Sequence, residues 1–271
     1  RWERMHKSKA ASIPIMAGAQ KRLYTIALLA VVSLFFIASL ITQFQPFELL
    51  AKMENFWLFI GQDLLPPQLQ NGELIWQGVW QTVCMALTAT AISAVFALVL
   101  AFLGSYSTTP WSPLTKVIRA GASLLRNIPS LIWTFILVMA YGIGTTVGAL
   151  ALLINTCGFL IRSFIETIDE TGNDNLELMK SVGAGYLPTI VQCVIPSAIP
   201  GFISWLLYSL EVNIRASTLV GAVGGGGIGL IMMGYIKSFR YHTAMGVILL
   251  IAAIVIGVDF LTNYLRKKVL V

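Results

Sequence analysis

The sequence predicts an all-α integral membrane protein with about six transmembrane helices. Of its 271 residues, 57% are hydrophobic and only 11% are charged, whereas about a quarter of the residues in a soluble domain are charged. The mean hydropathy is +0.80. Apolar runs of about twenty residues recur along the chain, and a helix of that length crosses a bilayer. The stretches between these runs are too short to fold as separate domains in water.

The first expected element is a transmembrane helix over Leu23–Thr42, which follows a basic stretch at residues 1–22. Its apolar run is longer than the roughly 7–15 residues of a secretory signal, so we expect the helix to be retained. In the loop Gln43–Gln77, the sequence PFELLAKMENFWLFIG has apolar residues at helical spacing. This pattern predicts an amphipathic helix on the outer membrane surface. Residues 1–78 are therefore expected to form an N-terminal region.

Residues 79–271 are expected to form the core transmembrane domain, with the other five spans. The third and fourth spans are separated only by GIGTT, so we expect a tight helical hairpin. The segment Leu219–Ile236 is apolar but rich in glycine, and we expect it to be re-entrant. Irregular backbone at that depth must be covered by protein or line a water-filled cavity. The five spans are Val79–Leu103, Leu124–Tyr141, Val147–Phe164, Ile190–Leu210 and Ala244–Leu265.

The lysine and arginine residues predict the orientation. If the N-terminus is cytoplasmic, all but four of the 18 Lys and Arg residues fall on the cytoplasmic side, as the positive-inside rule requires. We therefore expect both termini to face the cytoplasm. The basic residues are spread between the apolar runs, so the formal charge of +6 indicates membrane-flanking positions and not a nucleic-acid-binding face.

A polar segment, ELMKSVGAGYLPTIVQCVIP at Glu177–Pro196, separates the fourth and fifth spans; we call it the elbow segment. Asp174 precedes Glu177 by three residues, a capping-box spacing that predicts the start of a helix. Apolar residues follow at helical spacing. The sequence thus predicts a short amphipathic helix on the cytoplasmic surface, which is either an ordinary interfacial helix or a contact site for another protein.

Glycine and proline predict where that helix ends. Gly183 is a natural terminator, because glycine adopts the left-handed conformation without steric cost. Pro188 is expected to stop any continued helix, and Pro196 and Pro200 to mark the entry into the fifth span.

The spacing in the elbow segment resembles that of the membrane subunits of binding-protein-dependent ABC importers, whose Glu-Ala-Ala motif has a glycine six residues after the glutamate and a proline thirteen after the glycine. Here Glu177, Gly183 and Pro196 have that spacing, while Leu178 and Met179 replace the alanines. In that family the segment is a coupling helix that docks into a separate ATP-hydrolysing subunit. The resemblance assigns coupling to Asp174, Glu177, Met179, Lys180, Gly183, Ala184 and Pro196.

Four further segments resemble the phosphonate-type branch of these permeases: LLRNIPSLIW, FIETIDE, LEVNIRASTLVG and GAVGGGGIG. The last of them is also similar to methionine-importer permeases. The resemblance covers roughly residues 79 to 268 and implies a type I ABC importer permease fold. It further implies import of phosphonate, phosphite or a related phosphorus oxyanion across the bacterial inner membrane.

The resemblance also implies partners: a second copy of the chain, two ABC ATPase subunits and a periplasmic solute-binding protein. The chain has no G-x-x-x-x-G-K-[ST] phosphate-binding loop, so ATP and Mg are expected on the ATPase subunits and no cofactor on this chain. We expect a transport subunit and not an enzyme, because H-E-x-x-H and G-x-S-x-G are absent from the sequence. The histidines and cysteines show no metal-site spacing.

Two alternatives remain at this stage. The first is the same kind of permease for methionine or another small organic solute. The second is an ion-coupled secondary transporter, for which Asp259, an acidic residue deep in an apolar run, is the candidate ion-coupling group.

Polar residues near the span ends are candidates for the substrate pathway. Arg126, beside Asn127, lies at the inner end of the third span, where we favour extension of its side chain to lipid phosphate over substrate contact. Arg215 follows Glu211 by four residues, and we favour an ion pair on one helix face. The alternative is a forked donor for an oxyanion, made by Arg215 with Asn213.

The glycines of GAVGGGGIG are the remaining candidates. They include a G-x-G-x-x-G match, which we reject as a dinucleotide site because no strand precedes it. Small residues four apart allow close helix packing, and the alternative is a flexible element that lines an outer gate. The glycines assigned to the pathway are Gly224, Gly225, Gly226 and Gly227.

Overall fold

Every regular element in the described part of the chain is a helix, as the composition predicts. A computed structural model describes residues 18–44, 46–109, 111–181 and 183–269, without the side chains at 18, 19, 46, 49, 173–178, 180 and 181. The chain divides into two units, Arg1–Ile60 and Gly61–Val271. The helices are α1 (Gly18–Ile41), α2 (Pro46–Ala51), α3 (Met53–Phe59), α4 (Gly72–Gly104), α5 (Ser112–Asn127), α6 (Ser130–Tyr141), α7 (Thr145–Ser181), α8 (Tyr186–Thr189), α9 (Ile195–Val220), α10 (Gly227–Lys237) and α11 (Tyr241–Val269), with π-helical segments η1 (Ile60–Leu64), η2 (Ile190–Val194) and η3 (Gly221–Gly225).

The first unit contains the predicted first span, α1, whose described side chains are almost all exposed and mostly apolar. The predicted amphipathic helix is present as two short helices, α2 and α3, with Lys52 between them. Lys52 pairs with Glu48 four residues earlier, at 2.6 Å. Phe56 and Trp57 of α3 are exposed, as expected of a helix that lies on a membrane surface.

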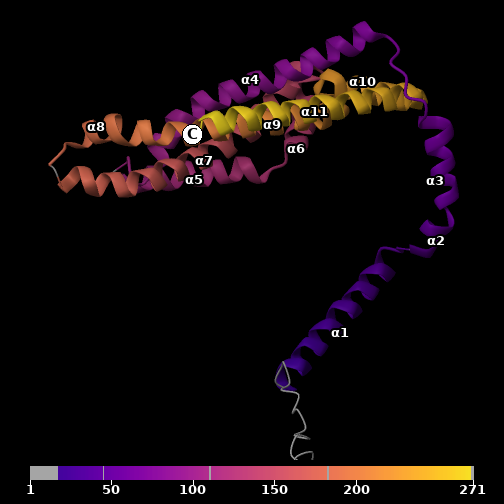
Figure 1. Cartoon of the computed structure of the whole chain (residues 1–271), viewed down its shortest axis with the longest axis horizontal. Helices are drawn as coiled ribbons and strands as arrows, with labels where there is room; N and C mark the ends of the chain where they lie inside the picture. Colours follow the sequence, from indigo (N-terminus) through magenta and orange to yellow (C-terminus); the bar gives the residue numbers. More distant parts are fainter. Residues whose placement is uncertain (1–17, 45, 110, 182, 270–271) are drawn as a thin grey trace, which may run out of the picture. The chain divides into compact units, whose positions relative to one another are not determined.

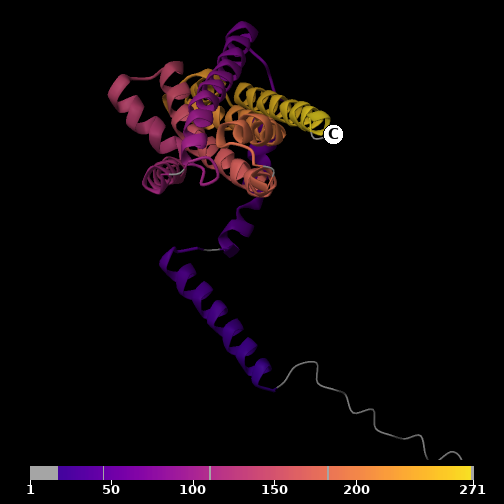
Figure 2. The ribbon, with the colours of Figure 1, turned by 90° about the vertical axis from the view of Figure 1, so that its left-hand side faces the viewer.

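In the second unit, α4, α7, α9 and α11 lie lengthwise beside one another (Figure 1), and α11 packs against α9 in the end-on view (Figure 2). A row of small residues on α4 faces α7, the helix it contacts most extensively. Small side chains let helix backbones approach closely where lipid gives no hydrophobic driving force. The fully buried alanines of α4 are Ala86, Ala89, Ala97 and Ala101.

The third predicted span is not one straight helix. It consists of α5 and α6, which meet at an angle of 83°. Pro129 follows Ile128 at the bend, and Ile128 has an extended backbone (φ −89°, ψ 116°). A residue before proline is disfavoured in the helical region because of a clash with the proline ring. The expectation of a continuous helix over Leu124–Tyr141 is therefore wrong, whereas the tight turn from α6 into α7 is confirmed.

The fourth span continues beyond its predicted end. Because α7 runs without a break to Ser181, the prediction that a separate helix starts at Asp174 is wrong. The most helix-weakening residue between Phe164 and Asp174 is Gly172, and one glycine costs about 1 kcal/mol relative to alanine. That cost is too small to end a long packed helix.

The end predicted at Gly183 is confirmed. Gly183 has a φ of +74°, and the N–H of Ala184 donates to the carbonyl of Met179 at 3.0 Å, as in a left-handed helix end. The chain re-enters a helix at Tyr186, so Pro188 lies in the first turn of α8 and does not stop a helix. Proline is tolerated there because first-turn N–H groups have no partner within the helix.

The α8, η2 and α9 segments form one helical stretch in which η2 precedes Pro196. Proline lacks the N–H of the regular helix and clashes with the carbonyl four residues earlier, and a π-helical turn accommodates both effects. The stretch ends in η3, where Gly224 has a φ of +110°, followed by Gly226 and Gly227 at +80° and +69°. Only glycine adopts such angles readily.

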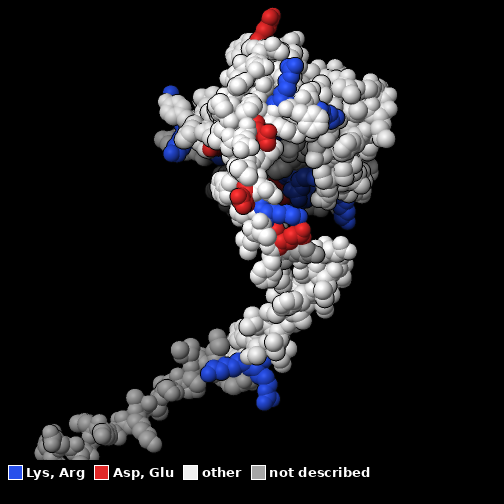
Figure 3. Space-filling view, turned by 90° about the vertical axis from the view of Figure 1, so that its right-hand side faces the viewer, with Lys and Arg blue, Asp and Glu red and all other residues white. Residues whose placement is uncertain are grey.

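The described residues contain five helices long and apolar enough to cross a membrane, or six if the bent α5–α6 pair counts as one span. The number agrees with the prediction. The 11-residue helix α10 is too short to span a membrane alone, as expected of a re-entrant segment. On the face shown in Figure 3, blue and red side chains are scattered among uncharged ones and form no basic patch.

Candidate functional site

A polar cavity of about 130 Å³ lies between α5, α7 and α9. Its volume holds several water molecules, since one water needs about 10–15 Å³ on the same measure. We call it the polar cavity. No carboxylate is among its lining residues, which are Arg126, Asn155, Thr156, Phe159, Tyr208, Ser209, Val212 and Asn213.

A close approach of α5 to α7 places Arg126 at the cavity. A Cβ atom on Gly158 of α7 would lie 2.9 Å from both the carbonyl oxygen of Ala122 and the amide nitrogen of Arg126. Any side chain at Gly158 would therefore push α5 away. Asn155 holds the same junction, because its Nδ2 donates to the carbonyl of Ile128 at 3.1 Å. This bond satisfies the backbone at the α5–α6 bend.

Asn213 is buried and held by two hydrogen bonds. The hydroxyl of Thr156 donates to its Oδ1 at 2.8 Å, and its Nδ2 donates to the hydroxyl of Thr90 at 2.9 Å. Thr90 in turn donates to the carbonyl of Ala86 at 2.8 Å. Each hydroxyl donates its single proton, Thr156 to Asn213 and Thr90 to Ala86, so Thr90 can only accept from Asn213. These bonds fix the orientation of the Asn213 amide between α4, α7 and α9.

Two lining groups lack protein partners. Of the carboxylates that the structure describes, none pairs with Arg126. The hydroxyl of Ser209 is buried without a hydrogen bond, although a buried polar group without a partner costs about 1–3 kcal/mol. The lining thus combines an exposed cation with a buried serine whose hydroxyl has no partner.

Two aromatic side chains, Phe159 and Tyr208, are part of the cavity lining. Their ring centroids are 5.7 Å apart, and Trp205, outside the lining, lies 5.7 Å from Phe159 and 6.0 Å from Tyr208. Edge and offset arrangements at these separations are favourable. The lining therefore contains apolar ring surface as well as polar groups.

The cavity lies near the middle of the spans. Thr156 is eleven residues after Thr145, where α7 begins, and Asn213 is twelve residues before Gly225, where the apolar stretch ends. At 1.5 Å per residue these positions are about 16–18 Å from the span ends, and a hydrocarbon core is about 30 Å thick. Arg126 lines the cavity with these residues and is exposed, and its expected extension to lipid phosphate stays a prediction.

The other polar pathway candidates do not line the polar cavity. Arg215 donates to Glu211 at 3.0 Å, so the i,i+4 pair that the spacing favours is present. Arg215 and Asn213 are not brought together as a forked donor, because Asn213 is bonded to Thr156 and Thr90. Asn127, the last residue of α5, is exposed.

The glycine candidates have different environments. Gly224 lines a second cavity of about 420 Å³, together with mostly apolar side chains of α6 and α10. A Cβ on Gly225 would lie 3.0 Å from Cα of Gly148, one on Gly226 2.9 Å from the backbone of Thr145, and one on Gly227 2.6 Å from the hydroxyl of Thr82. Close packing therefore accounts for three of these glycines, and cavity lining for Gly224.

The elbow segment is exposed beyond its turn. Tyr186 and Leu187 are 51% and 69% exposed, and the hydroxyl of Tyr186 donates to the carbonyl of Thr108 in the α4–α5 loop. Met179, Gly183 and Ala184 form the turn already described, and Pro196 lies in the first turn of α9. The side chains of Asp174, Glu177 and Lys180 lie outside the described part of the structure, although their backbone belongs to α7.

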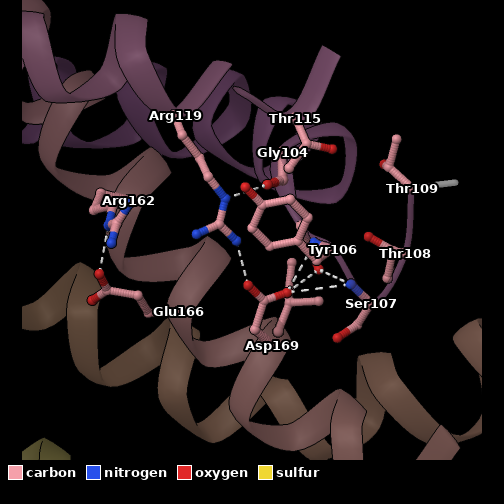
Figure 4. Close-up of polar contacts among 12 residues, drawn as sticks. Gly104, Tyr106, Ser107, Thr108, Thr109, Thr115, Arg119, Arg162, Glu166 and Asp169 are labelled. Atoms are coloured by element: carbon pink, nitrogen blue, oxygen red, sulfur yellow. Dashed lines mark hydrogen bonds and ion pairs between the residues drawn. The ribbon is translucent and has the colours of Figure 1, made fainter. Parts of the chain in front are cut away.

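The carboxylate of Asp169, on α7, accepts several hydrogen bonds from the loop after α4 and from α5 (Figure 4). These bonds come from the Ser105 hydroxyl, from the amides of Tyr106 and Ser107 at 3.1 and 3.4 Å, and from Arg119 of α5. Arg119 also donates to the carbonyl of Gly104 at 3.0 Å and lies 4.2 Å from the ring centre of Tyr106. These residues, which we call the Asp169 cluster, join α4, α5 and α7.

Neither the Asp169 cluster nor most of the cavity residues were predicted from the sequence. The sequence does contain polar residues inside and just beyond the predicted spans. Ser209 and Asn213 are four residues apart on α9, and Asn155 and Thr156 interrupt the apolar run of α7. Polar residues inside a span usually face the protein interior or a water-filled cavity. Their partners, however, are distant in sequence.

A protein-family model described as "Binding-protein-dependent transport system inner membrane component" matches residues 101–271, which is more than half of the chain. The chain is 31% identical over 227 residues to the "Phosphate-import permease protein PhnE" of Mycolicibacterium smegmatis, covering 84% of this chain. It spans only 42% of that relative's length.

The chain is also 33% identical over 208 residues to the "Phosphite transport system permease protein PtxC" of Stutzerimonas stutzeri, covering 77% of this chain and 76% of the relative. Among solved structures, an inward-facing form of the MetNI methionine ABC transporter matches with a TM-score of 0.65. That match covers 74% of this chain and 99% of the other at 20% identity, which shows a shared fold.

Proposed function

Because the chain belongs to the family of binding-protein-dependent transport system inner membrane components, we propose that it is the permease subunit of an ATP-driven ABC importer. Its solute is a phosphonate, phosphite or related phosphorus oxyanion that a periplasmic binding protein delivers. The substrate class is supported by two relatives whose names give phosphate import and phosphite transport. It is also supported by the unpaired Arg126 in a cavity without carboxylates.

The observation that carries the proposal of ATP coupling is the elbow turn. Gly183 reverses the chain at the spacing of the coupling motif, and exposed Tyr186 and Leu187 follow it. An exposed apolar group at the end of a bundle is suited to docking into a cleft of a partner protein. The proposed partners are two ATPase subunits, which bind ATP and Mg, and a second copy of this chain.

The proposed location is the bacterial inner membrane, with both termini and the elbow segment on the cytoplasmic side. The distribution of Lys and Arg supports this orientation. An ion-coupled mechanism has less support, because Asp259 accepts a hydrogen bond from Asn263 on its own helix at 3.0 Å. That bond gives the carboxylate a structural role.

The test is ATP-dependent uptake by proteoliposomes that contain this chain, its ATPase subunits and its binding protein. We expect uptake of radiolabelled phosphite or methylphosphonate that disappears when ATP or the ATPase is omitted. Uptake by vesicles that contain this chain alone would instead indicate an ion-coupled carrier. Uptake of methionine in place of both phosphorus compounds would refute the proposed substrate class while preserving the transport mechanism.

A further inference from the structure

We propose that the polar cavity binds the transported solute during its passage, with Arg126, Ser209 and Asn213 holding the tetrahedral oxyanion. The inference rests on the proposed function and adds a specific site within the permease itself. It assigns these residues a direct part in choosing the solute, in addition to any choice that the binding protein makes.

Arg126 brings a positive charge to the cavity lining. A charged side chain inside a membrane protein is normally paired or exposed to water. Arg126 is exposed, and the carboxylates in the described residues leave it unpaired, whereas Arg215, Arg119 and Arg162 each have an acidic partner. A guanidinium that keeps its donors free matches a phosphorus oxyanion, which it can bind through two parallel hydrogen bonds.

Neutral polar residues line the cavity together with this charge. Ser209 has a buried hydroxyl without a partner, and a bound oxyanion would accept its hydrogen bond. Asn213 uses one N–H for Thr90, and its amide group carries a second. With no carboxylate in the lining, the cavity attracts anions and offers no counter-charge to a cation.

In phosphite and phosphonates, phosphorus carries one substituent other than oxygen. In phosphite it is hydrogen, and in a phosphonate it is carbon, so one corner of the tetrahedron is apolar. The rings of Phe159 and Tyr208 belong to the cavity lining and are 5.7 Å apart. A bound ion that directs its oxygens to Arg126 can place its apolar corner against a ring. The volume of about 130 Å³ suits a small ion of this kind.

The experiment uses the complete importer in proteoliposomes and compares Arg126→Gln with Arg162→Gln. Arg126→Gln should lower the rate of methylphosphonate uptake at least tenfold, because the anion loses its cationic partner. ATP hydrolysis stimulated by the loaded binding protein should persist, because docking and coupling are unchanged. Arg162→Gln removes an equal charge outside the cavity and should leave uptake within about twofold of the unsubstituted importer.

Asn213→Asp is the second variant. It keeps the size of the side chain but places a carboxylate in the cavity, which should repel the anion and also lower uptake at least tenfold. If the importer with Arg126→Gln does not assemble, the uptake rate of Asn213→Asp tests the inference instead. Binding of the solute is measured directly by alkylation of Ser209→Cys, in a chain whose native cysteines are replaced by alanine. Millimolar methylphosphonate should slow alkylation of this cysteine.

The outcomes separate the two proposals. If the unsubstituted importer takes up neither phosphorus compound, the proposed function fails and this inference fails with it. If the unsubstituted importer takes up methylphosphonate and both cavity variants do so at the same rate, only the inference is overturned. Alkylation of Ser209→Cys that methylphosphonate does not slow would also overturn it.

Discussion

The turn after α7 depends on one backbone angle, the φ of +74° at Gly183. Replacement by alanine should lower stability by about 1–2 kcal/mol, because a side chain disfavours the left-handed region. Nothing lies within 4 Å of a Cβ atom built there, so the effect is one of backbone conformation alone. We expect Gly183→Ala to lower both the apparent melting temperature and the uptake per ATP hydrolysed.

Gly185→Ala is the matched control. Gly185 has a φ of −69°, and a Cβ there would make only an ordinary contact with Pro188 at 3.7 Å. Gly183→Asn should recover part of the loss, since asparagine tolerates the left-handed region. Equal melting temperatures for Gly183→Ala and Gly185→Ala would contradict the role of this angle.

Asp169 offers a second prediction. Its carboxylate and the Arg119 guanidinium are 21% and 16% exposed, and the carboxylate accepts several hydrogen bonds. Asp169→Asn should lower the unfolding free energy by about 1.5–3 kcal/mol, the usual contribution of hydrogen bonds to charged groups. The change is read from the melting temperature of the purified protein in detergent.

Glu166→Gln is the control for Asp169→Asn, because Glu166 lies three residues earlier on α7 and also pairs with an arginine (Figure 4). That pair spans one helical turn, with side chains 31% and 47% exposed, and such pairs contribute about 0.3–0.5 kcal/mol. A larger loss for Glu166→Gln than for Asp169→Asn would show that the Asp169 cluster does not hold the helices together.

Single residues were predictable where the relevant partner is close in sequence. The Glu211–Arg215 pair follows from a spacing of four on one helix, and Gly183 from the chemistry of helix ends. The residues that surround Arg126 were not predictable, because they come from α7 and α9, far along the chain. Sequence spacing carries no information about which distant helices meet, so neither the polar cavity nor the Asp169 cluster was predictable as a unit.

Contacts between helices allow a further prediction, at the start of α10. The N–H of Ile228 donates to the hydroxyl of Thr82 on α4 at 2.9 Å, and both residues are buried. Thr82→Val keeps the shape of the side chain but leaves this N–H without a partner, so we expect a loss of about 1–3 kcal/mol. Thermal unfolding in detergent measures it.

Thr262→Val tests whether that loss is specific to the contact. Thr262 is equally buried, but its hydroxyl donates only to carbonyls of its own helix, at 2.9 and 3.1 Å. Those carbonyls also belong to the regular helix, so the change should be small. Similar melting temperatures for the two variants would mean that Thr82 does not hold α10 against α4.

Whole helices were predicted more reliably than their breaks. Six apolar runs indicated the spans because a bilayer imposes a minimum length. The bend at Pro129 was missed, although proline weakens helices. The continuation of α7 past Gly172 was also missed, because glycine weakens helices and a new helix start was expected at Asp174. Proline ended α5, whereas one glycine did not end α7, because the penalty of about 3 kcal/mol for proline is far larger than that for glycine.

The orientation of the second unit in the membrane gives the last prediction. Single cysteines at two exposed positions, Ser238→Cys after α10 and Gly185→Cys before α8, are introduced into a chain without its native cysteines. In intact spheroplasts, a membrane-impermeant thiol reagent should label Ser238→Cys and spare Gly185→Cys. Permeabilised cells should show labelling of both, and the reverse pattern in spheroplasts would place the elbow segment outside.

Each copy of the chain would carry its own set of Arg126, Ser209 and Asn213, because these residues come from α5 and α9 of the same polypeptide. Occupancy should therefore scale with the number of copies: one equivalent of solute per chain, and two per assembled pair. An equilibrium titration that saturates at half of that value would locate the ligand on the symmetry axis instead.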